Sequence, residues 1–452
     1  MIKSVLIANR GEIALRVART CRELGLRTVA VYSDADADSA VVRFADTAVR
    51  IGPGPAKASY LRIPAIIEAA RISGADAIHP GYGFLSEDPD FAEVCEAEEL
   101  TFIGAPAPVM AALGDKARAR GIMLKAGLPL LPGSRDPFPD AGSAEAFAEQ
   151  IGYPVIIKAV AGGGGMGMQV VRDPAAFRSA FEQTGSTALA IFGDGRLYVE
   201  RYLESARHVE IQVLADALGN VVHLGGRDCS LQRRQQKLVE ESPVPRVPDD
   251  LVARMGAAAV RGALAAGYVG AGTFEFLLDP ERGEFYFMEV NCRLQVEHPV
   301  TEMVTGMDLV REQIRIASGL PLGYGQDGIV HRGAAIECRI NAEDPLRGFR
   351  PTPGVLTEFS PPGGPFVRVD THARAGYEVP AHYDSLLAKV IVWAPDRDAA
   401  IARMRRALGE LRAGGPAVST TAEFLSGLID NPRFRAAEHD TALVTGLVAE
   451  LA

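Results

Sequence analysis

The sequence predicts an α/β fold with a parallel sheet at the N-terminus, followed by mixed α+β regions. Up to Gly104, short apolar runs alternate with amphipathic helical stretches, as in strands joined by helical crossovers. Beyond that point, segments with two-residue alternation and a glycine- and proline-rich β-type region over 351–380 indicate further strands. The 452 residues are enough for two or three domains with sizeable cores.

Composition excludes several classes of protein. The net charge of -10 leaves no basic footprint of the kind that a general nucleic-acid binder needs. No apolar run reaches membrane-spanning length and the chain starts with a strand-like segment, so we expect a cytoplasmic protein that contacts no membrane. The cysteines lack the paired spacing of a zinc site and are expected to be reduced thiols: Cys21, Cys95, Cys229, Cys292 and Cys338.

The first elements are a strand over 4–8, an amphipathic helix that ends near Gly25, and a strand over 27–32. The turn after the first strand lacks the G-x-G-x-x-G fingerprint, so no dinucleotide site is predicted there. The segment 79–87 is typical of a strand-to-helix loop, with Ser86 as the expected N-cap. Such loops at the carboxyl ends of strands line ligand crevices.

A glycine run in the middle of the chain predicts a phosphate-binding lid. A helix over 115–126 and a hinge-like stretch over 128–142 precede it. A β-branched strand carrying Lys158 leads into the loop 161–167, whose backbone N–H groups can close over phosphates. The strand-like segment 168–171 follows, so this is not a P-loop. The alternative is a merely flexible loop, but the lysine directly before the glycines favours the lid.

Two further strands are predicted over 197–203 and 207–213. The second alternates sharply and puts His208, Glu210 and Gln212 on one face. A single histidine on a strand is more often structural than functional, so the pattern alone does not select His208.

The polar run 227–237 has a solvated loop as its default interpretation. Lys237 stands close to the carboxylates Glu240 and Glu241, however, and this group could hold an anion. An amphipathic helix over 249–267 follows.

A β-hairpin comes next, because two β-rich runs flank the turn-forming stretch 279–283. If Arg282 is the centre of the loop, Glu275 lies opposite Glu289. Opposed carboxylates destabilise a strand pair unless a cation compensates them, and Mg²⁺ with nucleotide phosphates suits such oxygen ligands. Asn291 adds a third oxygen on the same face, so we predict a metal–nucleotide site. The alternative is a different register with one ordinary surface carboxylate.

The stretch 288–298 continues the alternation. One face carries only carboxylates, amides and a guanidinium: Glu289, Asn291, Arg293, Gln295 and Glu297. The other face is packable: Met288, Val290, Cys292, Leu294 and Val296. Fully extended, the polar face would span roughly 26 Å, which is too long for one small ligand. We therefore expect a bend, with regular strand pairing ending between Asn291 and Gln295.

The remaining elements are a helix over 308–319, a strand over 333–341 and a helix over 396–412. The strand alternates and turns three polar side chains to one face: Glu337, Arg339 and Asn341.

Together these features resemble an ATP-grasp enzyme and, over nearly the full length, a biotin carboxylase. Five motifs in order carry the resemblance, at 7–14, 79–87, 272–276, 295–302 and 337–345. The resemblance implies a Rossmann-like N-terminal domain before the ATP-grasp unit, a mobile glycine-rich lid and a β-rich C-terminal domain. The implied parts are 1–114, a connecting helix over 115–130, the lid domain 131–203, the catalytic core 204–330 and the C-terminal domain 331–452.

The resemblance also implies that ATP phosphorylates bicarbonate to carboxyphosphate and that the resulting CO₂ is transferred to a biotin nitrogen. Residues expected to bind ATP are Lys116, Lys158, Gly164, Gly165, Glu200, Arg201, Tyr202, Leu203, His208, Gln232 and Gln235. The expected ligands of Mg²⁺ or Mn²⁺, with two ions, are Glu275, Glu289 and Asn291.

On the acceptor side, the resemblance assigns bicarbonate to Lys237, Arg293, Gln295 and the Val296 backbone. Glu297 would be the general base, and Arg339 would stabilise the biotin enolate, with Tyr82 at the border of the biotin site. Lys237, Arg293, Glu297 and Arg339 are thus the expected catalytic residues.

Some residues depart from the family pattern: Ala161 and Met166 in the lid, Gln235 at a nucleotide contact, Cys292 on the packed face, and Pro365-Phe366 where a dimer-contact phenylalanine is common. None of them replaces the base, a metal ligand or the bicarbonate arginine, so activity is still expected.

The chain has no Ala-Met-Lys-Met tetrapeptide for biotin attachment, so biotin is expected on a separate carrier protein. Carboxyltransferase subunits and a second copy of the chain, in a homodimer, are the other implied partners. The most favoured system is acetyl-CoA carboxylase. The alternatives are another acyl-CoA carboxylase, an ATP-grasp ligase for a different acid, and a non-catalytic scaffold. The acyl-CoA that is finally carboxylated is not encoded in this chain.

Overall fold

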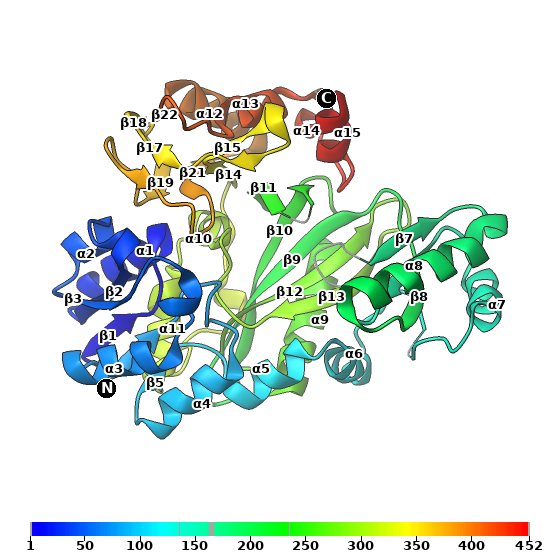
Figure 1. The fold of residues 1–452 in the computed structure, drawn as a ribbon, viewed down its shortest axis with the longest axis horizontal. Coiled ribbons are helices and arrows are strands. Elements are labelled where there is room, and N and C mark those ends of the chain that lie inside the picture. Colours follow the sequence, from blue (N-terminus) through cyan, green and yellow to red (C-terminus); the bar gives the residue numbers. More distant parts are fainter. Residues whose placement is uncertain (1, 135, 162–166, 235, 451–452) are drawn as a thin grey trace.

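The computed structural model describes residues 2–134, 136–161, 167–234 and 236–450 (Figure 1). The predicted N-terminal α/β unit is confirmed, because five strands form a parallel sheet in the order β3-β2-β1-β4-β5. The strands are β1 (Ser4–Ile7), β2 (Arg27–Ser33), β3 (Thr47–Gly52), β4 (Ala77–His79) and β5 (Thr101–Phe102). The helices are α1 (Gly11–Glu23), α2 (Ala40–Phe44), α3 (Ile63–Ser73), α4 (Pro89–Ala97) and α5 (Ala107–Gly114).

The loop between β4 and α4 differs from the prediction at the helix cap. The N-cap is Asp88, whose side chain accepts a hydrogen bond from the Phe91 backbone N–H at 3.1 Å. Ser86 is buried in the preceding turn and therefore cannot cap the helix. The loop is held against the end of β1 by Asn9, whose Nδ2 donates to the Tyr82 carbonyl at 2.7 Å.

A smaller unit, at the right of Figure 1, contains the antiparallel sheet β7-β6-β8. Its strands are β6 (Val155–Ala159), β7 (Met168–Val171) and β8 (Leu197–Arg201), and its helices are α7 (Ala141–Ile151) and α8 (Phe177–Phe192). Helix α6 (Lys116–Lys125) leads into it. The lid glycines Gly164 and Gly165, together with Met166, lie outside the described residues.

The largest sheet has eight antiparallel strands in the order β13-β12-β9-β10-β11-β14-β21-β19. Their bounds are β9 (Arg207–Ala215), β10 (Val221–Arg233), β11 (Gln236–Ser242), β12 (Gly270–Asp279), β13 (Glu284–Asn291), β14 (Ala334–Asn341), β19 (Val367–Thr371) and β21 (Leu386–Ala394). The helices that follow these strands in the chain are α9 (Asp249–Ala266), α10 (His298–Thr305) and α11 (Leu309–Ala317). Since β11 pairs with β14, one sheet continues from the central region into the C-terminal region.

The polar run 227–237 is not a solvated loop, contrary to the default interpretation. Most of it lies in the hairpin β10–β11, at the centre of the large sheet. The charges at its start are buried because each has a partner: Arg227 is fully buried against Glu210, and Arg207 Nε contacts Asp228 Oδ2 at 2.8 Å. Arg233 is half-buried and Arg234 is exposed, where the hairpin turns. Partnered charges of this kind are compatible with burial, whereas unpaired ones are not.

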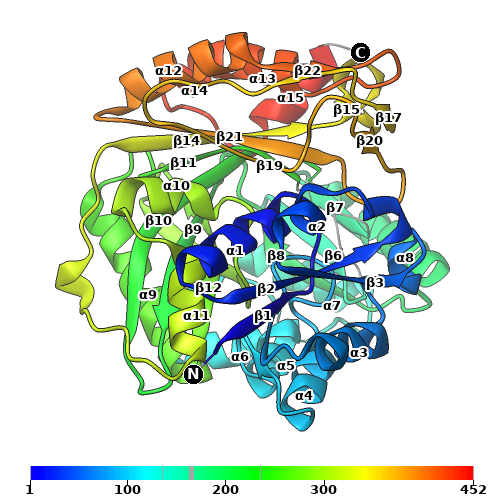
Figure 2. The ribbon, with the colours of Figure 1, turned by 90° about the vertical axis from the view of Figure 1, so that its left-hand side faces the viewer.

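The C-terminal region confirms the predicted β structure and the predicted helix over 396–412, but this helix is not the last one, because α13, α14 and α15 follow it. The strands are β15 (Glu343–Asp344), β16 (Arg350–Pro351), β17 (Gly354–Val355), β18 (Glu358–Ser360), β20 (Glu378–Val379) and β22 (Arg412–Gly414). The helices are α12 (Arg397–Glu410), α13 (Ala422–Asp430), α14 (Pro432–Arg435) and α15 (Leu443–Glu450). Figure 2 shows α12 and α13 as a layer above β14 and β21, with which they share an apolar core.

Two expectations from composition can be compared with this structure. All five cysteines are buried and form no disulfide, in agreement with the prediction. Among the described residues, no helix combines the length and the apolar character that a membrane crossing requires.

Candidate active site

A buried lysine connects the predicted metal side and the predicted bicarbonate side of the site. Lys237 Nζ lies 2.7 Å from Glu210, 3.1 Å from Glu275 and 2.6 Å from Glu297. These residues come from β11, β9, β12 and the segment before α10, so the sheet order brings them together. Two of the three carboxylates also contact an arginine, Glu210 with Arg227 and Glu297 with Arg339.

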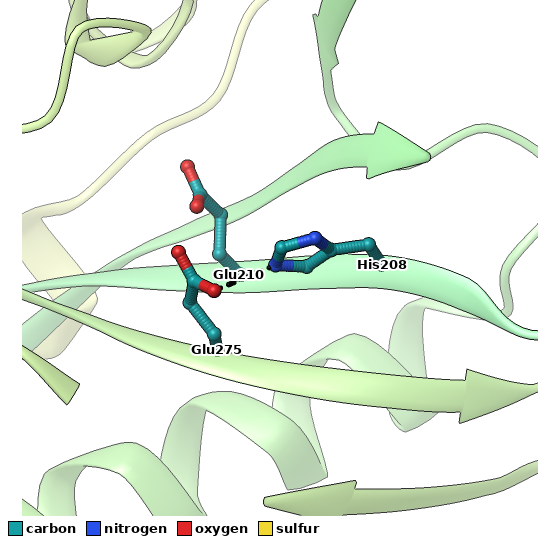
Figure 3. A group of neighbouring side chains, drawn as sticks. All are labelled: His208, Glu210 and Glu275. Atoms are coloured by element: carbon teal, nitrogen blue, oxygen red, sulfur yellow. Dashed lines mark ion pairs between the residues drawn. The ribbon is translucent and has the colours of Figure 1, made fainter. Parts of the chain in front are cut away.

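His208 belongs to the same cluster, which the strand pattern alone did not establish. Its Nε2 lies 2.9 Å from Glu275 Oε2 (Figure 3). Burial would raise the pKa of the Glu275 carboxyl, but Lys237 and His208 outweigh it and hold that pKa well below its usual range. Burial by itself would lower the pKa of His208, but the negative charge of Glu275 outweighs burial and raises that pKa above its usual value.

The opposed pair of carboxylates is confirmed, although not in the way we expected. Glu275 pairs with Glu289 because a β-bulge lies between this pair and the next pair, Phe276 with Phe287. The extra residue is Met288, which is 39% exposed and does not lie on the packed face as predicted. A bulge inserts one residue and changes which face the side chains beyond it occupy.

The chemistry of these side chains fits a magnesium ion. Loss of solvent and the negative charge of Glu275 raise the pKa of Glu289, and a cation would relieve this repulsion. Asn291 lies within reach, since its Nδ2 donates to Glu275 Oε1 at 2.9 Å and its Oδ1 accepts from Arg293 at 3.2 Å. The amide would turn its oxygen toward a bound ion. His208, Glu210 and Glu275 form another group whose ligand atoms lie within 4.8 Å of one another.

The predicted bend is confirmed. Pairing of β13 ends at Asn291, and α10 begins at His298 with Glu297 at its N-cap position. Within the bend, Arg293 contacts Glu87 Oε2 at 2.7 Å and Gln295 Oε1 at 3.0 Å. Glu87 lies in one of the family-type motifs but was given no role, because nothing in the sequence shows which cation it meets.

Glu297, the predicted base, is fully buried between two cations. Lys237 lies 2.6 Å from Oε1, and Arg339 Nη2 lies 2.8 Å from Oε2. Burial would raise the pKa of this carboxyl, but the two cations outweigh it and hold the pKa well below its usual range. Glu297 is therefore ionised at neutral pH and able to accept a proton. An entering anion has to compete with it for Lys237 and Arg339.

On the predicted biotin side, Arg339 is shared between two acids. Its Nε donates to Glu240 Oε1 at 2.6 Å, in addition to its contact with Glu297. Tyr82 donates to Glu12, and its hydroxyl is near enough to Arg339 for the guanidinium to lower its pKa, although burial dominates and raises it. Glu240 and Glu12 were not singled out as site residues.

The nucleotide side contains an unexpected ion pair. Lys158 Nζ lies 2.6 Å from Glu200 Oε2, and Arg120 lies 2.7 Å from Glu200 Oε1. Lys158 and Glu200 face each other because β6 pairs with β8, with Glu200 opposite Ile156. Arg120 was not predicted, because it lies on α6, far from both in sequence. Lys116 begins the same helix and acts electrostatically on Glu289.

The other predicted nucleotide residues lie along the same side. Arg201 ends β8, with Tyr202 and Leu203 directly after it, and all three are half-buried. Gln232 pairs with Lys237 across the β10–β11 hairpin. Gln235, the expected family difference, lies outside the described residues.

Comparison with known proteins shows the family of the chain. The chain matches the family models "Biotin carboxylase, N-terminal domain" over residues 1–110, "Carbamoyl-phosphate synthase L chain, ATP binding domain" over 115–324 and "Biotin carboxylase C-terminal domain" over 337–446. Biotin carboxylase 1 of Bacillus subtilis is 52% identical over 441 residues and covers 98% of both chains. Biotin carboxylase of Pseudomonas aeruginosa is 53% identical over 435 residues and covers 96% of both.

Solved structures give the same result. A biotin carboxylase complex with β-γ-ATP from Campylobacter jejuni is 48% identical, with a TM-score of 0.91 and 98% of both chains covered. The biotin carboxylase domain of Hydrogenobacter thermophilus 2-oxoglutarate carboxylase, solved as a dimer with MgADP, ADP and bicarbonate, is 46% identical, with a TM-score of 0.92 and 100% and 99% of the chains covered.

The three-stranded sheet β7-β6-β8, the eight-stranded sheet with its buried carboxylates and these matches define an ATP-grasp enzyme, an ATP-dependent ligase. More narrowly, the chain belongs to the biotin carboxylase family, whose members carboxylate biotin at the expense of ATP.

Proposed function

We propose that this chain uses ATP and bicarbonate to carboxylate biotin held on a separate carrier protein. The observation that supports the proposal best is Glu297, a buried carboxylate that contacts both Lys237 and Arg339, beside the Glu275 metal side. A base between two cations is suited to an anionic substrate whose proton has to be removed.

The residues act in a definite order. Lys116 and Lys158 position the phosphates, and Glu200 must release Lys158 as ATP enters, since the two are paired at 2.6 Å. Glu275, Glu289 and Asn291 would hold Mg²⁺, which neutralises phosphate charge when bound. We expect two ions, because the resemblance to the biotin carboxylase family implies them.

Arg293, Gln295 and the Val296 backbone orient bicarbonate, and Glu297 removes its proton as the oxygen attacks the γ-phosphorus and ADP leaves. Carboxyphosphate then yields CO₂ and phosphate. The released phosphate takes the proton of the biotin ureido nitrogen, Arg339 stabilises the resulting enolate, and the nitrogen then attacks the CO₂.

The test is turnover of the purified chain with free biotin, labelled bicarbonate and Mg·ATP. We expect biotin-dependent ADP release and labelled carboxybiotin, with loss of both in Glu297→Gln. ADP release no greater than in a control without biotin would refute the proposal. A labelled product other than carboxybiotin would identify a different ATP-grasp ligase, and wild-type rates in Glu297→Gln would indicate a scaffold.

A separate proposal concerns the molecule that finally receives the carboxyl group from biotin. We propose acetyl-CoA carboxylase, with a biotin carrier and carboxyltransferase subunits as partners in the cytoplasm. One of the pyruvate carboxylase subunits of Methanothermobacter thermautotrophicus is 51% identical over 444 residues, so identity does not separate acceptors. Capture of the partners on the tagged chain decides between them.

We also propose a homodimer. Its support is the dimer named for the Hydrogenobacter thermophilus domain, to which the chain is similar over its full length. The expected result in sedimentation analysis is twice the 48.1 kDa mass of the chain.

A further inference from the structure

Two buried carboxylates face each other beside the biotin side of the site. Glu240 on β11 pairs directly with Glu337 on β14, and both are fully buried. Directly opposed like charges destabilise a strand pair. Neither oxygen of Glu337 nor Oε2 of Glu240 has a hydrogen-bond partner among the described residues. A buried carboxylate without a donor is costly in its ionised form.

The charged groups around this pair do not compensate it. The titratable groups that interact electrostatically with the two carboxyls come from every neighbouring strand and from the bend. They are Lys237 on β11, Cys229 on β10, Cys338 and Arg339 on β14, Lys389 on β21, and Glu297.

The three cations among these groups are already engaged. Lys237 contacts three other carboxylates. Lys389 Nζ lies 3.1 Å from Glu12 and donates to the Val296 carbonyl at 2.8 Å. Arg339 is shared by Glu240 and Glu297, which leaves Glu337 without a cation of its own among the residues described.

We propose that Glu240 and Glu337 carry one proton between them, and that this proton preserves the positive charge which Arg339 presents to biotin. The proposal rests on the proposed function, which assigns biotin to Arg339. Burial raises the pKa of both carboxyls, that of Glu337 well above its usual range and that of Glu240 less far, because Arg339 partly offsets the effect of burial on Glu240. The proton therefore resides on Glu337.

The consequence concerns the enolate of biotin. With the proton in place, Arg339 faces two ionised acids, Glu240 and Glu297. Without it, a third negative charge lies two residues away on the same face of β14 and opposes the developing enolate. Glu337 thus acts through Arg339 and is a positioning residue rather than a catalytic one.

The proton itself is tested by infrared spectroscopy on the full chain, without any substrate. The wild type should show a protonated-carboxyl band at pH 7 that Glu337→Gln lacks. The matched control is Glu343→Gln, which removes a buried acid that accepts from Ser385 at 2.5 Å, and it should keep the band. Absence of the band in the wild type, or its survival in Glu337→Gln, overturns the proposal.

A second variant keeps the test decisive if Glu337→Gln fails to fold. In Glu240→Gln the opposed charge is gone and Arg339 is released, so the band should persist but disappear at a lower pH than in the wild type. An unchanged midpoint would overturn the pairing of the two acids.

The link to Arg339 is tested by kinetics at saturating bicarbonate. In the wild type, kcat/KM for free biotin should fall by about tenfold as the pair loses its proton at high pH. This fall should flatten in Glu337→Gln, while KM for ATP stays within about twofold, since one proton-bearing acid is removed far from the phosphates. If kcat/KM for free biotin falls as steeply at high pH in Glu337→Gln as in the wild type, the proposed link between Glu337 and Arg339 is wrong. Absence of biotin-dependent turnover in the wild type refutes the proposed function instead, and the infrared result still decides where the proton resides.

Discussion

At the scale of single residues, Arg339 and Lys389 are the cations whose contacts say most about the acceptor side. Arg339 is the only hydrogen-bond donor to Glu240 among the described residues and also contacts Glu297. Lys389 is fully buried and joins Glu12 on α1 to the Val296 carbonyl in the bend. On the proposed function, Arg339 would face biotin and Lys389 would hold the segment that presents bicarbonate.

Replacement of Arg339 by Ala should reduce biotin carboxylation by about 100-fold or more, because the positive charge at the enolate is lost. The dissociation constant for ATP should change by less than about threefold, since the contacts of Arg339 in the described part of the chain lie away from the nucleotide side. Both are measured on the same preparation, by carboxybiotin formation and by calorimetry. Equal losses in the two would show that the biotin side has been misplaced.

Replacement of Lys389 by Met should lower kcat/KM for bicarbonate by about 100-fold, because a small shift of the bend misplaces Gln295 and Glu297. KM for ATP should be unaffected. The exposed Lys57→Met variant is the control for removal of a lysine charge. A parallel rise of both KM values would indicate general loss of structure instead of positioning.

At the scale of elements, the hairpin β12–β13 is the most informative. From the turn to the pair Phe276–Phe287, the two strands keep one regular register. The bulge at Met288 then shifts the register by one residue, so that Glu275 opposes Glu289. Pairing then stops at Asn291, and within the bend Arg293 contacts Glu87 and Gln295. On the proposed function, the bulge and the bend would divide one alternating stretch between metal and bicarbonate.

Deletion of Met288 should keep metal-dependent ADP formation within about tenfold of the wild type, because Glu289 would then follow Phe287 directly and still oppose Glu275, now in regular pairing. Met288→Ala is the matched control, since it keeps the residue count and should keep most of the activity. Magnesium titrations of both variants provide the measurement. A loss of metal affinity of about 100-fold or more in the deletion variant alone would contradict this register.

At the scale of the whole molecule, Arg10 joins the N-terminal unit to the C-terminal region. Arg10 Nε contacts Asp36 Oδ2 at 2.7 Å within the N-terminal unit. Arg10 also donates to the Tyr377 hydroxyl at 3.2 Å and stacks over the Tyr383 ring at 4.1 Å, and both tyrosines come from the C-terminal region. On the proposed function, this junction would hold Tyr82 and Arg339, which come from the two units, at one site.

Replacement of Asp36 by Asn should lower the free energy of unfolding by about 3 kcal/mol at neutral pH, because it leaves the buried Arg10 unpaired. Burial would raise the pKa of Asp36, but its bonds with Arg10 outweigh it and lower the pKa. The unfolded chain then binds more protons than the folded one, so this stability is present above about pH 4 and is lost as the pH falls further.

The difference between wild type and Asp36→Asn, measured by calorimetry over about pH 3 to 7, should therefore shrink on acidification. Glu145→Gln, which breaks an exposed pair with Arg178, is the control and should cost less than about 1 kcal/mol. A difference independent of pH would contradict the assignment.

The sequence by itself predicted the elements and much of the site chemistry. Strand alternation and turn residues are local, so the hairpin and the end of pairing near Asn291 could be predicted from spacing. The opposition of Glu275 and Glu289 was predicted for a regular register centred on Arg282, but it arises from the bulge at Met288. The family-type motifs added roles that spacing cannot assign, such as a base at Glu297.

Tertiary structure alone decided which charges meet. Glu87 with Arg293, Arg120 with Glu200, and Lys389 with Glu12 join residues far apart in the chain, and no local pattern encodes such pairs. The burial of the 227–237 run and the exposure of Met288 follow from the same cause. Sheet order and a single bulge determine which face of a strand is covered, and both depend on long-range pairing.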